Sequence, residues 1–374
     1  MGCKRIIVAG HMSLDITPAI SNSECQDISK LLKPGKLLQV GEAKISAGGA
    51  VSNTGFALNK LGENVTLISK IGNDVFGNIL EKIIEESGCN TRLIKSDNEV
   101  TSYTIVITSE GSDRIFLHDP GCNHTFSYYD IDWDLVEKSD YFHFGYPTIM
   151  RNFYKNDGEE LVQLYKKVKE KNLVTSLDLS SVDPNSEAGK CNWEAILKRV
   201  LPYVDFFVPS IEELGFMLDR KRYDIWQKKA GQDDIISVLS LENDIKPLAQ
   251  KALSYGCKSI LLKCGKAGMY LKTSAEEVMT QIDTDLKGWG NIEIFENSYV
   301  PDKIVSATGA GDTSIAAFLK CVMRGKSPEE SIRYATATGA CCVTTYDTIS
   351  GLKTLEQLQE KIENGWAKQY IVNN

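Results

Sequence analysis

The chain has 374 residues, of which 42% are hydrophobic and 25% are charged, and its formal net charge is −8. This composition is that of an ordinary globular protein with a sizeable core. The acidic balance argues against binding to nucleic acid or to a membrane surface through basic patches. The ten cysteines are scattered and form no C-x-x-C pair, which is typical of a reduced, cytoplasmic protein. The apolar run after Lys4 and Arg5 is too short for a signal peptide or a membrane span.

Short β-branched runs alternate with amphipathic helical stretches along most of the chain. Arg5–Ala9 is apolar throughout its length after the first residue, as expected for a strand buried on both sheet faces. Further helices are predicted at Ala50–Leu61 and Val75–Ser87, and further strands at Asn64–Lys70, Tyr141–Phe144, Val174–Leu179, Val204–Val208 and Ser259–Lys263. This alternation predicts an α/β fold with a doubly wound, mostly parallel sheet and helices on both faces. No linker divides the chain, so residues 1–374 are expected to form a single domain.

Two segments interrupt this alternation. Ser102–Ser109 and Asp113–Leu117 flank a glycine-containing turn and predict a β-hairpin. Ile16–Ile45 is irregular and contains short extended pieces. We expect the two segments, about 13–47 and 99–119, to form a small β-sheet lid over one end of the main sheet. Two other polar, weakly periodic stretches are interpreted as surface insertions, Arg220–Asn243 and Thr273–Asn297.

The most informative stretch is a glycine-rich loop at Ser306–Thr313. Lys303–Val305 predicts a strand before this loop, and the apolar spacing of Ser314–Met323 predicts a helix after it. Gly309 and Gly311 permit a close approach of the backbone to a ligand. Because the first amides of a helix are free and the helix dipole favours negative charge there, this loop predicts a site for a phosphoryl group.

Asp312 stands at the lip of this anion site. A carboxylate there repels phosphate unless it has a task, and accepting a proton from an attacking hydroxyl is such a task. The alternative is that Asp312 only caps the helix, since Asp is favoured at that position. The loop by itself leaves both interpretations open. It is not a Walker A loop, because no Gly-Lys-Ser/Thr follows.

A second glycine-containing motif precedes the helix at Ala50–Leu61. Gly48 and Gly49 let the backbone close on a small ligand, and Asn53 can donate and accept hydrogen bonds toward hydroxyl groups. Asp15, soon after the first strand, can accept hydrogen bonds from neighbouring sugar hydroxyls. The alternative for Asn53 and Asp15 is a turn with a structural hydrogen bond.

Together these motifs resemble the ribokinase-like (PfkB-type) carbohydrate kinase family. The matching segments span most of the chain and are Gly10–Asp15, Ala47–Asn53, Leu61-Gly62, Ile71–Gly77, Gly121–Asn123, Lys263–Gly268 and Gly309–Asp312. The resemblance implies a ribokinase-like fold and a kinase that uses ATP and Mg²⁺ to phosphorylate a hydroxyl of a small sugar. It also implies that Asp312 is the general base.

The resemblance assigns roles to further residues. It implies an anion hole from the backbone amides of Gly309, Ala310 and Gly311. It implies a sugar site formed by Asp15, Gly48, Gly49 and Asn53. It implies a nucleotide site formed by Ser210, Glu213, Lys263, Gly265 and Thr308, with Glu213 also acting indirectly on the metal ion.

Two positions depart from the family pattern. Ser210 stands where the family often has the Asn of an Asn-x-x-Glu motif, whereas Glu213 matches, so the water or metal network there is expected to differ. Ser306 stands where the glycine loop usually begins with an Asp that helps to bind a monovalent cation. We therefore predict weak or absent activation by potassium.

Three other functions are alternatives to a sugar kinase. A nucleoside kinase of the same fold needs an aromatic cleft for the base, for which Tyr103, Phe116 and Tyr146 are candidate walls. A non-catalytic regulator that binds a sugar or nucleotide is disfavoured by the retained Asp312 and its glycines. An NAD-dependent enzyme is excluded, because the sequence from Gly10 lacks the second and third glycines of G-x-G-x-x-G.

The four histidines lie in different elements without metal-ligand spacing and are assigned no role; they are His11, His118, His124 and His143. An uncovered lid sheet would expose an edge and an apolar face, which favours a homodimer through the lid. A small sugar or nucleoside is the expected binding partner.

Overall fold

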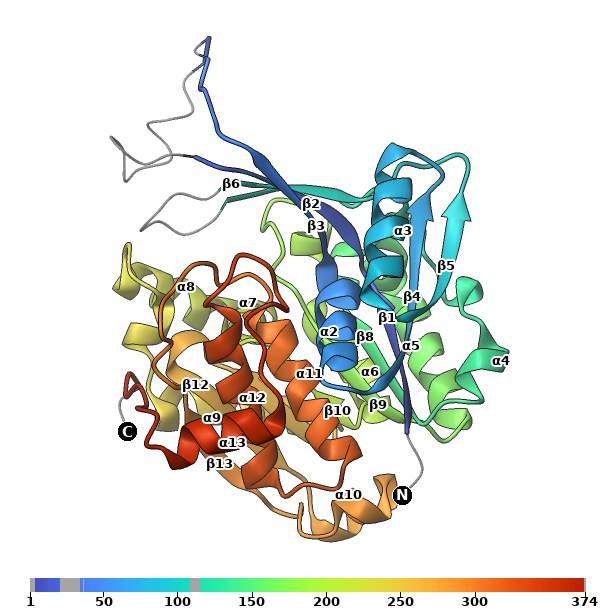
Figure 1. The fold of residues 1–374 in the computed structure, drawn as a ribbon. Coiled ribbons are helices and arrows are strands. Elements are labelled where there is room, and N and C mark those ends of the chain that lie inside the picture. Colours follow the sequence, from blue (N-terminus) through green and yellow to red (C-terminus); the bar gives the residue numbers. More distant parts are fainter. Residues whose placement is uncertain (1–3, 21–33, 36, 108–114, 373–374) are drawn as a thin grey trace.

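The computed structural model describes residues 4–20, 34–35, 37–107 and 115–372. A nine-stranded sheet forms the centre of the molecule, and helices cover both of its faces (Figure 1). The strand order is β13-β12-β11-β10-β9-β8-β1-β4-β5. The strands from β11 to β5 are parallel, and β12 and β13 add to one edge in antiparallel pairs. The predicted doubly wound, mostly parallel sheet is therefore confirmed.

The elements follow one another in the alternation that the sequence predicts. The strands of the main sheet are β1 (Arg5–Gly10), β4 (Asn64–Gly72), β5 (Asn90–Ser96), β8 (Tyr141–Gly145), β9 (Val174–Asp178), β10 (Phe206–Phe207), β11 (Ser259–Lys263), β12 (Gly268–Thr273) and β13 (Glu293–Asn297). The helices are α2 (Gly49–Lys60), α3 (Val75–Ser87), α4 (Trp133–Val136), α5 (Arg151–Glu170), α6 (Trp193–Val200), α7 (Ile211–Leu218), α8 (Arg220–Ala230), α9 (Lys246–Ser254), α10 (Glu276–Ile282), α11 (Ala310–Met323), α12 (Pro328–Cys342) and α13 (Leu355–Glu363).

The central strand β1 shows why its sequence is apolar without alternation. Successive side chains of a strand point to opposite faces of the sheet. Ile7 and Ala9 belong to the core on the side of α5, α6, α7 and α9. Ile6 and Val8 belong to the core on the side of α2, α3, α11 and α12. Because helices cover both faces, every position after Arg5 is buried.

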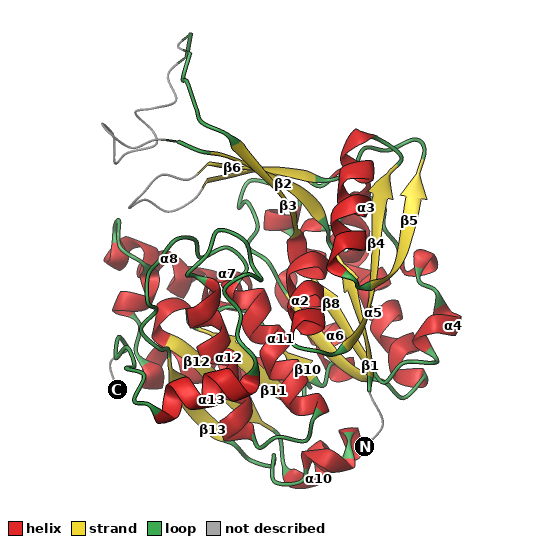
Figure 2. Cartoon of the chain, in the orientation of Figure 1, coloured by secondary structure: helices red, strands yellow, loops and turns green. Residues whose placement is uncertain are grey.

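A second, four-stranded sheet projects from one end of this body (Figure 2). Its order is β3-β2-β6-β7, and its strands are β2 (Ser13–Pro18), β3 (Ala43–Gly48), β6 (Tyr103–Ile107) and β7 (Ile115–Asp119). These strands come from the two segments from which the sequence predicts a lid. β6 and β7 pair antiparallel as the predicted hairpin, and its turn at 110–112 lies outside the described residues.

Two sequence predictions were wrong. Lys303–Val305 is not a strand, because the amide of Val305 bonds to the carbonyl of Val343 after α12 rather than to a strand. Thr273–Asn297 is not only a surface insertion, since it contains α10 and the edge strand β13. The alternation that marks a strand is hidden in β13, whose side chains are all exposed or half-buried. The other expected insertion is anchored on the core by the buried Trp226 of α8.

Among the described residues, no helix is both long enough and apolar enough to span a lipid bilayer.

Candidate active site

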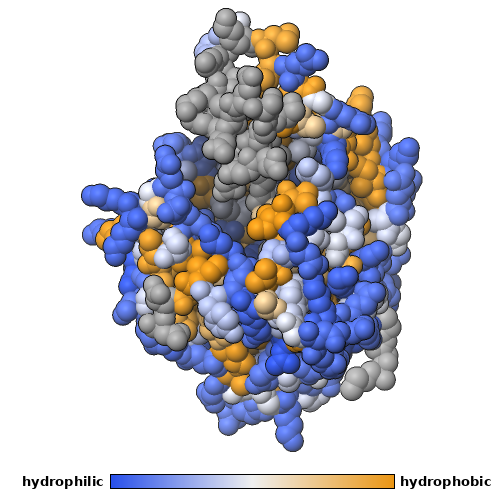
Figure 3. Space-filling model, turned by 60° about the vertical axis from the view of Figure 1, so that its left-hand side comes forward, coloured by the Kyte–Doolittle hydropathy of each residue, from blue (hydrophilic) through white to orange (hydrophobic). Residues whose placement is uncertain are grey.

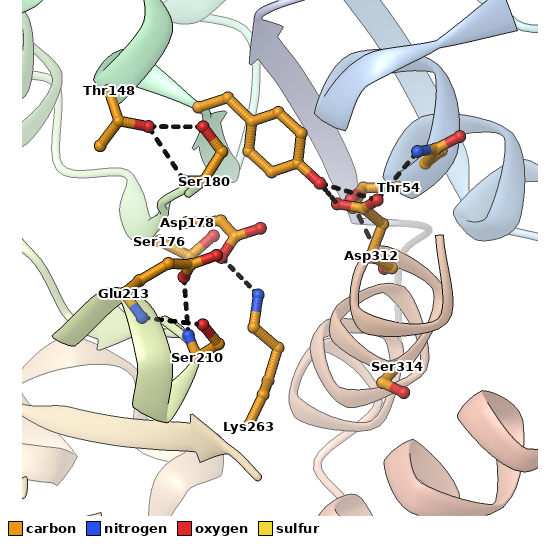
Figure 4. A network of polar contacts seen from close by, with 12 residues as sticks. Thr54, Thr148, Ser176, Asp178, Ser180, Ser210, Glu213, Lys263, Asp312 and Ser314 are labelled. Carbon is orange, nitrogen blue, oxygen red and sulfur yellow. Dashed lines mark hydrogen bonds and ion pairs between the residues drawn. The ribbon is translucent and has the colours of Figure 1, made fainter. Parts of the chain in front are cut away.

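The polar residues of the candidate site gather where the parallel strands of the main sheet end (Figure 4). Asp178 is the last residue of β9, Lys263 is the last of β11, and Tyr146 directly follows β8. Ligands of open α/β sheets bind at this carboxyl edge, beside the point where the strand order reverses. The N-terminus of α11 approaches the same edge, which brings Asp312 to these residues.

Helix α11 begins at Ala310, with Gly309 as its N-cap in a left-handed conformation (φ 71°). Asp312 therefore lies in the first turn and is not the capping residue, so the capping interpretation was wrong. A methyl group on Gly309 would lie 2.3 Å from Cγ2 of Thr348. Both the backbone conformation and the lack of space therefore favour glycine at this position.

The carboxylate of Asp312 is buried, with 3% of the residue exposed. The amide of Asn53 donates to Oδ2 at 2.9 Å, and the hydroxyl of Tyr146 donates to Oδ1 at 2.8 Å and to Oδ2 at 3.0 Å. Burial raises the pKa of Asp312 above its ordinary value, although Lys263 and the two hydrogen-bond donors oppose this effect. A carboxylate with a raised pKa is a better proton acceptor near neutral pH.

A buried ammonium group lies beside the start of α11. Nζ of Lys263 donates to Oδ1 of Asp178 at 2.6 Å, and the side chains are 11% and 0% exposed. A methyl group placed on Gly311 would lie 3.7 Å from this Nζ. Burial lowers the pKa of Lys263, but the charges of Asp178, Glu213 and Asp312 outweigh this and raise it. The charged form of Lys263 is therefore favoured next to the predicted anion hole.

The carboxylates around this lysine outnumber it. Burial raises the pKa of Asp178 and of Glu213, while Lys263 opposes the increase at both. Oδ2 of Asp178 is buried and has no hydrogen-bond partner among the described residues. One lysine thus faces the carboxyl groups of Asp178, Glu213 and Asp312, and one oxygen of Asp178 remains available.

The structure places Ser210 and Glu213 at the start of α7. The two residues form a capping box, in which the Ser210 hydroxyl accepts from the Glu213 amide and the Glu213 carboxylate accepts from the Ser210 amide. Ser210 also forms a parallel bridge with Lys263. Gly265 lies two residues after Lys263 and has φ 51°. A Cβ atom at this position would have no neighbouring atom within 4 Å. Thr308 donates its amide to the hydroxyl of Ser306.

The predicted sugar-binding residues lie at the junction of the two sheets. Asp15 is in β2, and Gly48 ends the neighbouring strand β3. A Cβ atom on Gly48 would lie 2.2 Å from Oδ2 of Asp15, so the carboxylate rests against the glycine backbone. Burial raises the pKa of Asp15 to about 6, and the charge of Asp312 contributes to the increase. Gly49 has φ 82° and lies against His11.

Asn53 is the one predicted sugar-binding residue with a direct contact to Asp312. Sequence reasoning gave no catalytic role to three other residues of the site, which are Asp178, Tyr146 and His11. Asp178 is a carboxylate next to the carboxyl end of the predicted strand Val174–Leu179, and this position is a signal that could have identified it. The sequence indicates Tyr146 only as a candidate wall for a base. His11, assigned no role, stacks at 6.3 Å on the Tyr146 ring.

The nine-stranded sheet between two layers of helices, with a small second sheet beside it, is a ribokinase-like fold. The chain belongs to the pfkB family of carbohydrate kinases, whose family model matches residues 5–355. The resemblance inferred from the motifs is therefore confirmed.

Individual relatives are distant but cover most of the chain. A protein of Archaeoglobus fulgidus described as an uncharacterized sugar kinase is 25% identical over 79% of this chain and 97% of its own. Ribokinase from Arabidopsis thaliana, solved with ribose and ATP, has a TM-score of 0.70 at 20% identity and covers 96% of this chain and 98% of its own. A putative ribokinase II from E. coli, solved with ATP and Mg²⁺, has a TM-score of 0.66 at 20% identity, with coverage of 96% and 99%.

Proposed function

We propose that this protein transfers the γ-phosphoryl group of ATP to a hydroxyl of a small sugar, with Asp312 as the general base. The observation that carries the proposal is the buried Asp312 carboxylate in the first turn of α11, close to the ammonium group of Lys263. A base and an anion site thus occupy the same helix turn. Phosphoryl transfer needs this combination, since it depends on positioning and on stabilising charge at the phosphoryl oxygens.

In this mechanism Asp312 accepts the proton of the attacking sugar hydroxyl. The sugar oxygen then bonds to the γ-phosphorus while the bond to the bridging oxygen breaks and ADP leaves. The amides of Gly309, Ala310 and Gly311 and the ammonium group of Lys263 stabilise the charge on the phosphoryl oxygens. Ser210, Gly265 and Thr308 are proposed to line the nucleotide site.

The residues present fit the Mg²⁺ ion that ATP-dependent phosphoryl transfer implies. Mg²⁺ usually keeps several waters and is held by one or two carboxylates together with substrate phosphates. Among the described residues there is no ready-made group of three or more His, Cys, Asp and Glu ligands. Asp178, through its unpartnered Oδ2, and Glu213 would hold the hydrated ion. When bound, Mg²⁺ neutralises phosphate charge.

A sugar suits the described part of the site better than a nucleoside does. The three candidate aromatic walls serve different purposes: Tyr103 packs edge-on against Phe76, Tyr146 bonds to Asp312, and Phe116 is half-exposed on the small sheet. They do not form one cleft for a base. Asp15 is suited instead to accept hydrogen bonds from hydroxyl groups. A non-catalytic regulator would have no use for a buried base beside an anion site.

The small sheet is proposed to act as a lid and as a dimer interface. Its outward side chains include Ile45 and Leu117, which are 50% and 51% exposed, and Figure 3 shows apolar residues on this projecting part of the surface. Exposed apolar area of this kind favours association. A homodimer in sedimentation experiments that dissociates in Leu117→Ser would support this arrangement, whereas a monomeric wild-type protein would contradict it.

The experiment that tests the function is ADP release from Mg²⁺-ATP in the presence of pentoses, hexoses, keto sugars and nucleosides. The proposal expects turnover that depends on one or a few free sugars. Turnover confined to nucleosides would identify a nucleoside kinase. Tight sugar binding without turnover would favour a regulator.

A further inference from the structure

The hydroxyl of Tyr146 contacts both oxygens of the Asp312 carboxylate, although the two residues are 166 positions apart in the chain. A hydroxyl has one proton to donate, so this hydrogen bond is shared between the two oxygens. Oδ2 also receives the amide of Asn53, whereas Oδ1 receives only Tyr146 among the described residues. The side of the carboxylate with the spare acceptor capacity is therefore Oδ1.

The backbone of Tyr146 adopts a conformation that a tyrosine rarely takes. Its φ of 65° and ψ of 41° lie in the left-handed region, which glycine and asparagine enter far more readily. The amide of Tyr146 donates to the carbonyl of Asp178 at 3.3 Å, and Pro147 follows. A turn alone would favour glycine here, so a tyrosine in this conformation points to a task for its side chain.

We propose that Tyr146 is a positioning residue for the reaction: it orients the Asp312 carboxylate and favours its ionised form, so that Oδ1 accepts the substrate proton. This inference rests on the proposed function of Asp312. When a substrate hydroxyl donates to Oδ1, the proton of Tyr146 settles on Oδ2 beside Asn53. The substrate proton then moves to Oδ1, and Tyr146 keeps its own proton throughout.

The surroundings of Tyr146 support a role as a donor only. Burial and the charges of Asp312 and Asp178 raise the pKa of the phenol well above its ordinary value. Tyr146 therefore stays protonated and cannot replace Asp312 as the base. The other titratable groups that act on or near the Asp312 carboxylate come from five elements and are Lys263, Asp178, Glu213, Asp15 and Cys342.

The test is the pH dependence of kcat/KM in Tyr146→Phe. Removing a donor to the carboxylate raises the pKa of Asp312, so the acid limb of the profile should move to higher pH. At neutral pH the loss should be on the order of tenfold and should shrink as the pH rises. A loss that is equal at all pH values, or an unchanged acid limb, would overturn the proposal.

A matched control is Tyr165→Phe, because that buried hydroxyl donates to the carbonyl of Ser176 at 2.7 Å and not to a carboxylate. Its pH profile should equal that of the wild type even if its stability falls. Tyr146→Asn, which suits the left-handed backbone, should lose activity in the same pH-dependent way; wild-type behaviour of this variant would also overturn the proposal.

A second readout needs no turnover. The carboxyl ¹³C shift of Asp312, followed against pH, should titrate at higher pH in Tyr146→Phe than in the wild type, and equal midpoints would overturn the proposal. If the wild type turns over no sugar, the proposed function fails while this titration still decides the role of Tyr146. If turnover depends on Asp312 but not on Tyr146, only the present inference fails.

Discussion

Lys263 and Asp178 form a buried ion pair, with 2.6 Å between Nζ and Oδ1, and the charges of Glu213 and Asp312 act on the same ammonium group. Three carboxylates thus share one lysine at the edge of the sheet. Because the pKa values of all three are raised by burial, their ionisation weakens the folded state as the pH rises. Lys263 offsets part of that cost and also places a positive charge beside the anion site.

Lys263→Met should therefore reduce both stability and activity. We expect a loss of ~3 kcal/mol in the free energy of unfolding at pH 8, and a smaller loss at pH 5, where more of the carboxylates are protonated in the variant. Turnover should fall ~10²-fold or more because a charge that stabilises the phosphoryl group is gone. The double variant with Asp178→Asn should regain stability without regaining turnover. Urea denaturation and ADP release measure the two effects, and parallel recovery of both would contradict this role for Lys263.

Gly309 and Gly311 provide a matched pair of substitutions. Alanine at Gly309 must adopt φ near 71° and would clash with Thr348, so it should cost ~2 kcal/mol or more in the free energy of unfolding. Alanine at Gly311 has room, since the nearest atom would be 3.5 Å away in Lys263. It should leave stability unchanged or raise it by up to ~1 kcal/mol.

The activities of the two glycine variants should not follow their stabilities. The methyl group of Gly311→Ala would stand beside Nζ of Lys263, where the phosphoryl group is proposed to lie. We expect turnover to fall about 10²-fold because the phosphoryl group is displaced. A stable Gly311→Ala variant with full activity would show that the transferred group lies elsewhere.

Asp15 links substrate binding to pH. Its pKa in the folded protein is about 6, above the ordinary value of 3.8. The folded state therefore holds this proton more tightly than the unfolded state, and stability is lost as the pH rises from about 4 to about 6. Asp15→Asn should be more stable than the wild type at pH 8, on the order of 3 kcal/mol at most, and the difference should vanish below pH ~4.

The same variant should bind the sugar less tightly, because the ionised carboxylate is the better acceptor for hydroxyl groups. In the wild type, KM for the sugar should rise as the pH falls through about 6. Thermal unfolding across this pH range and sugar titrations measure the two effects. Higher stability with unchanged sugar affinity would remove Asp15 from the substrate site.

Potassium should have little effect on turnover. The hydroxyl of Ser306 donates to Oγ1 of Thr308 and accepts from its amide, so this residue forms a local turn and provides no carboxylate for a cation. Equal rates with potassium and with a large inert cation are expected at constant ionic strength. A strong requirement for potassium would contradict this prediction.

The sequence predicted those features of the site that are local in the chain. Gly309, Gly311 and Asp312 lie together at the start of α11, and the predicted helix Val75–Ser87 is followed by Gly88 as its C-cap, because caps and periodicity involve neighbouring residues. The roles of Tyr146 and Asp178 depend on which strands are neighbours in the sheet. β8 and β9 lie side by side, and α11 reaches their ends only in the folded chain.

The wrong predictions also have a physical reason. Val305 lies in a short run with strand-like composition, but its backbone is satisfied by the end of α12. The edge strand β13 has no fully buried face, so its sequence lacks the alternation by which strands are recognised.

The most direct test of Asp312 as the base is the single-turnover rate of phosphoryl transfer in wild type and Asp312→Asn, at saturating Mg²⁺-ATP and sugar. Asparagine keeps the shape and the contact with Asn53 but cannot take a proton. The account predicts a loss of ~10²–10⁴-fold in this rate, with nucleotide and sugar binding largely retained. A variant that transfers the phosphoryl group at a rate near that of the wild type would contradict it.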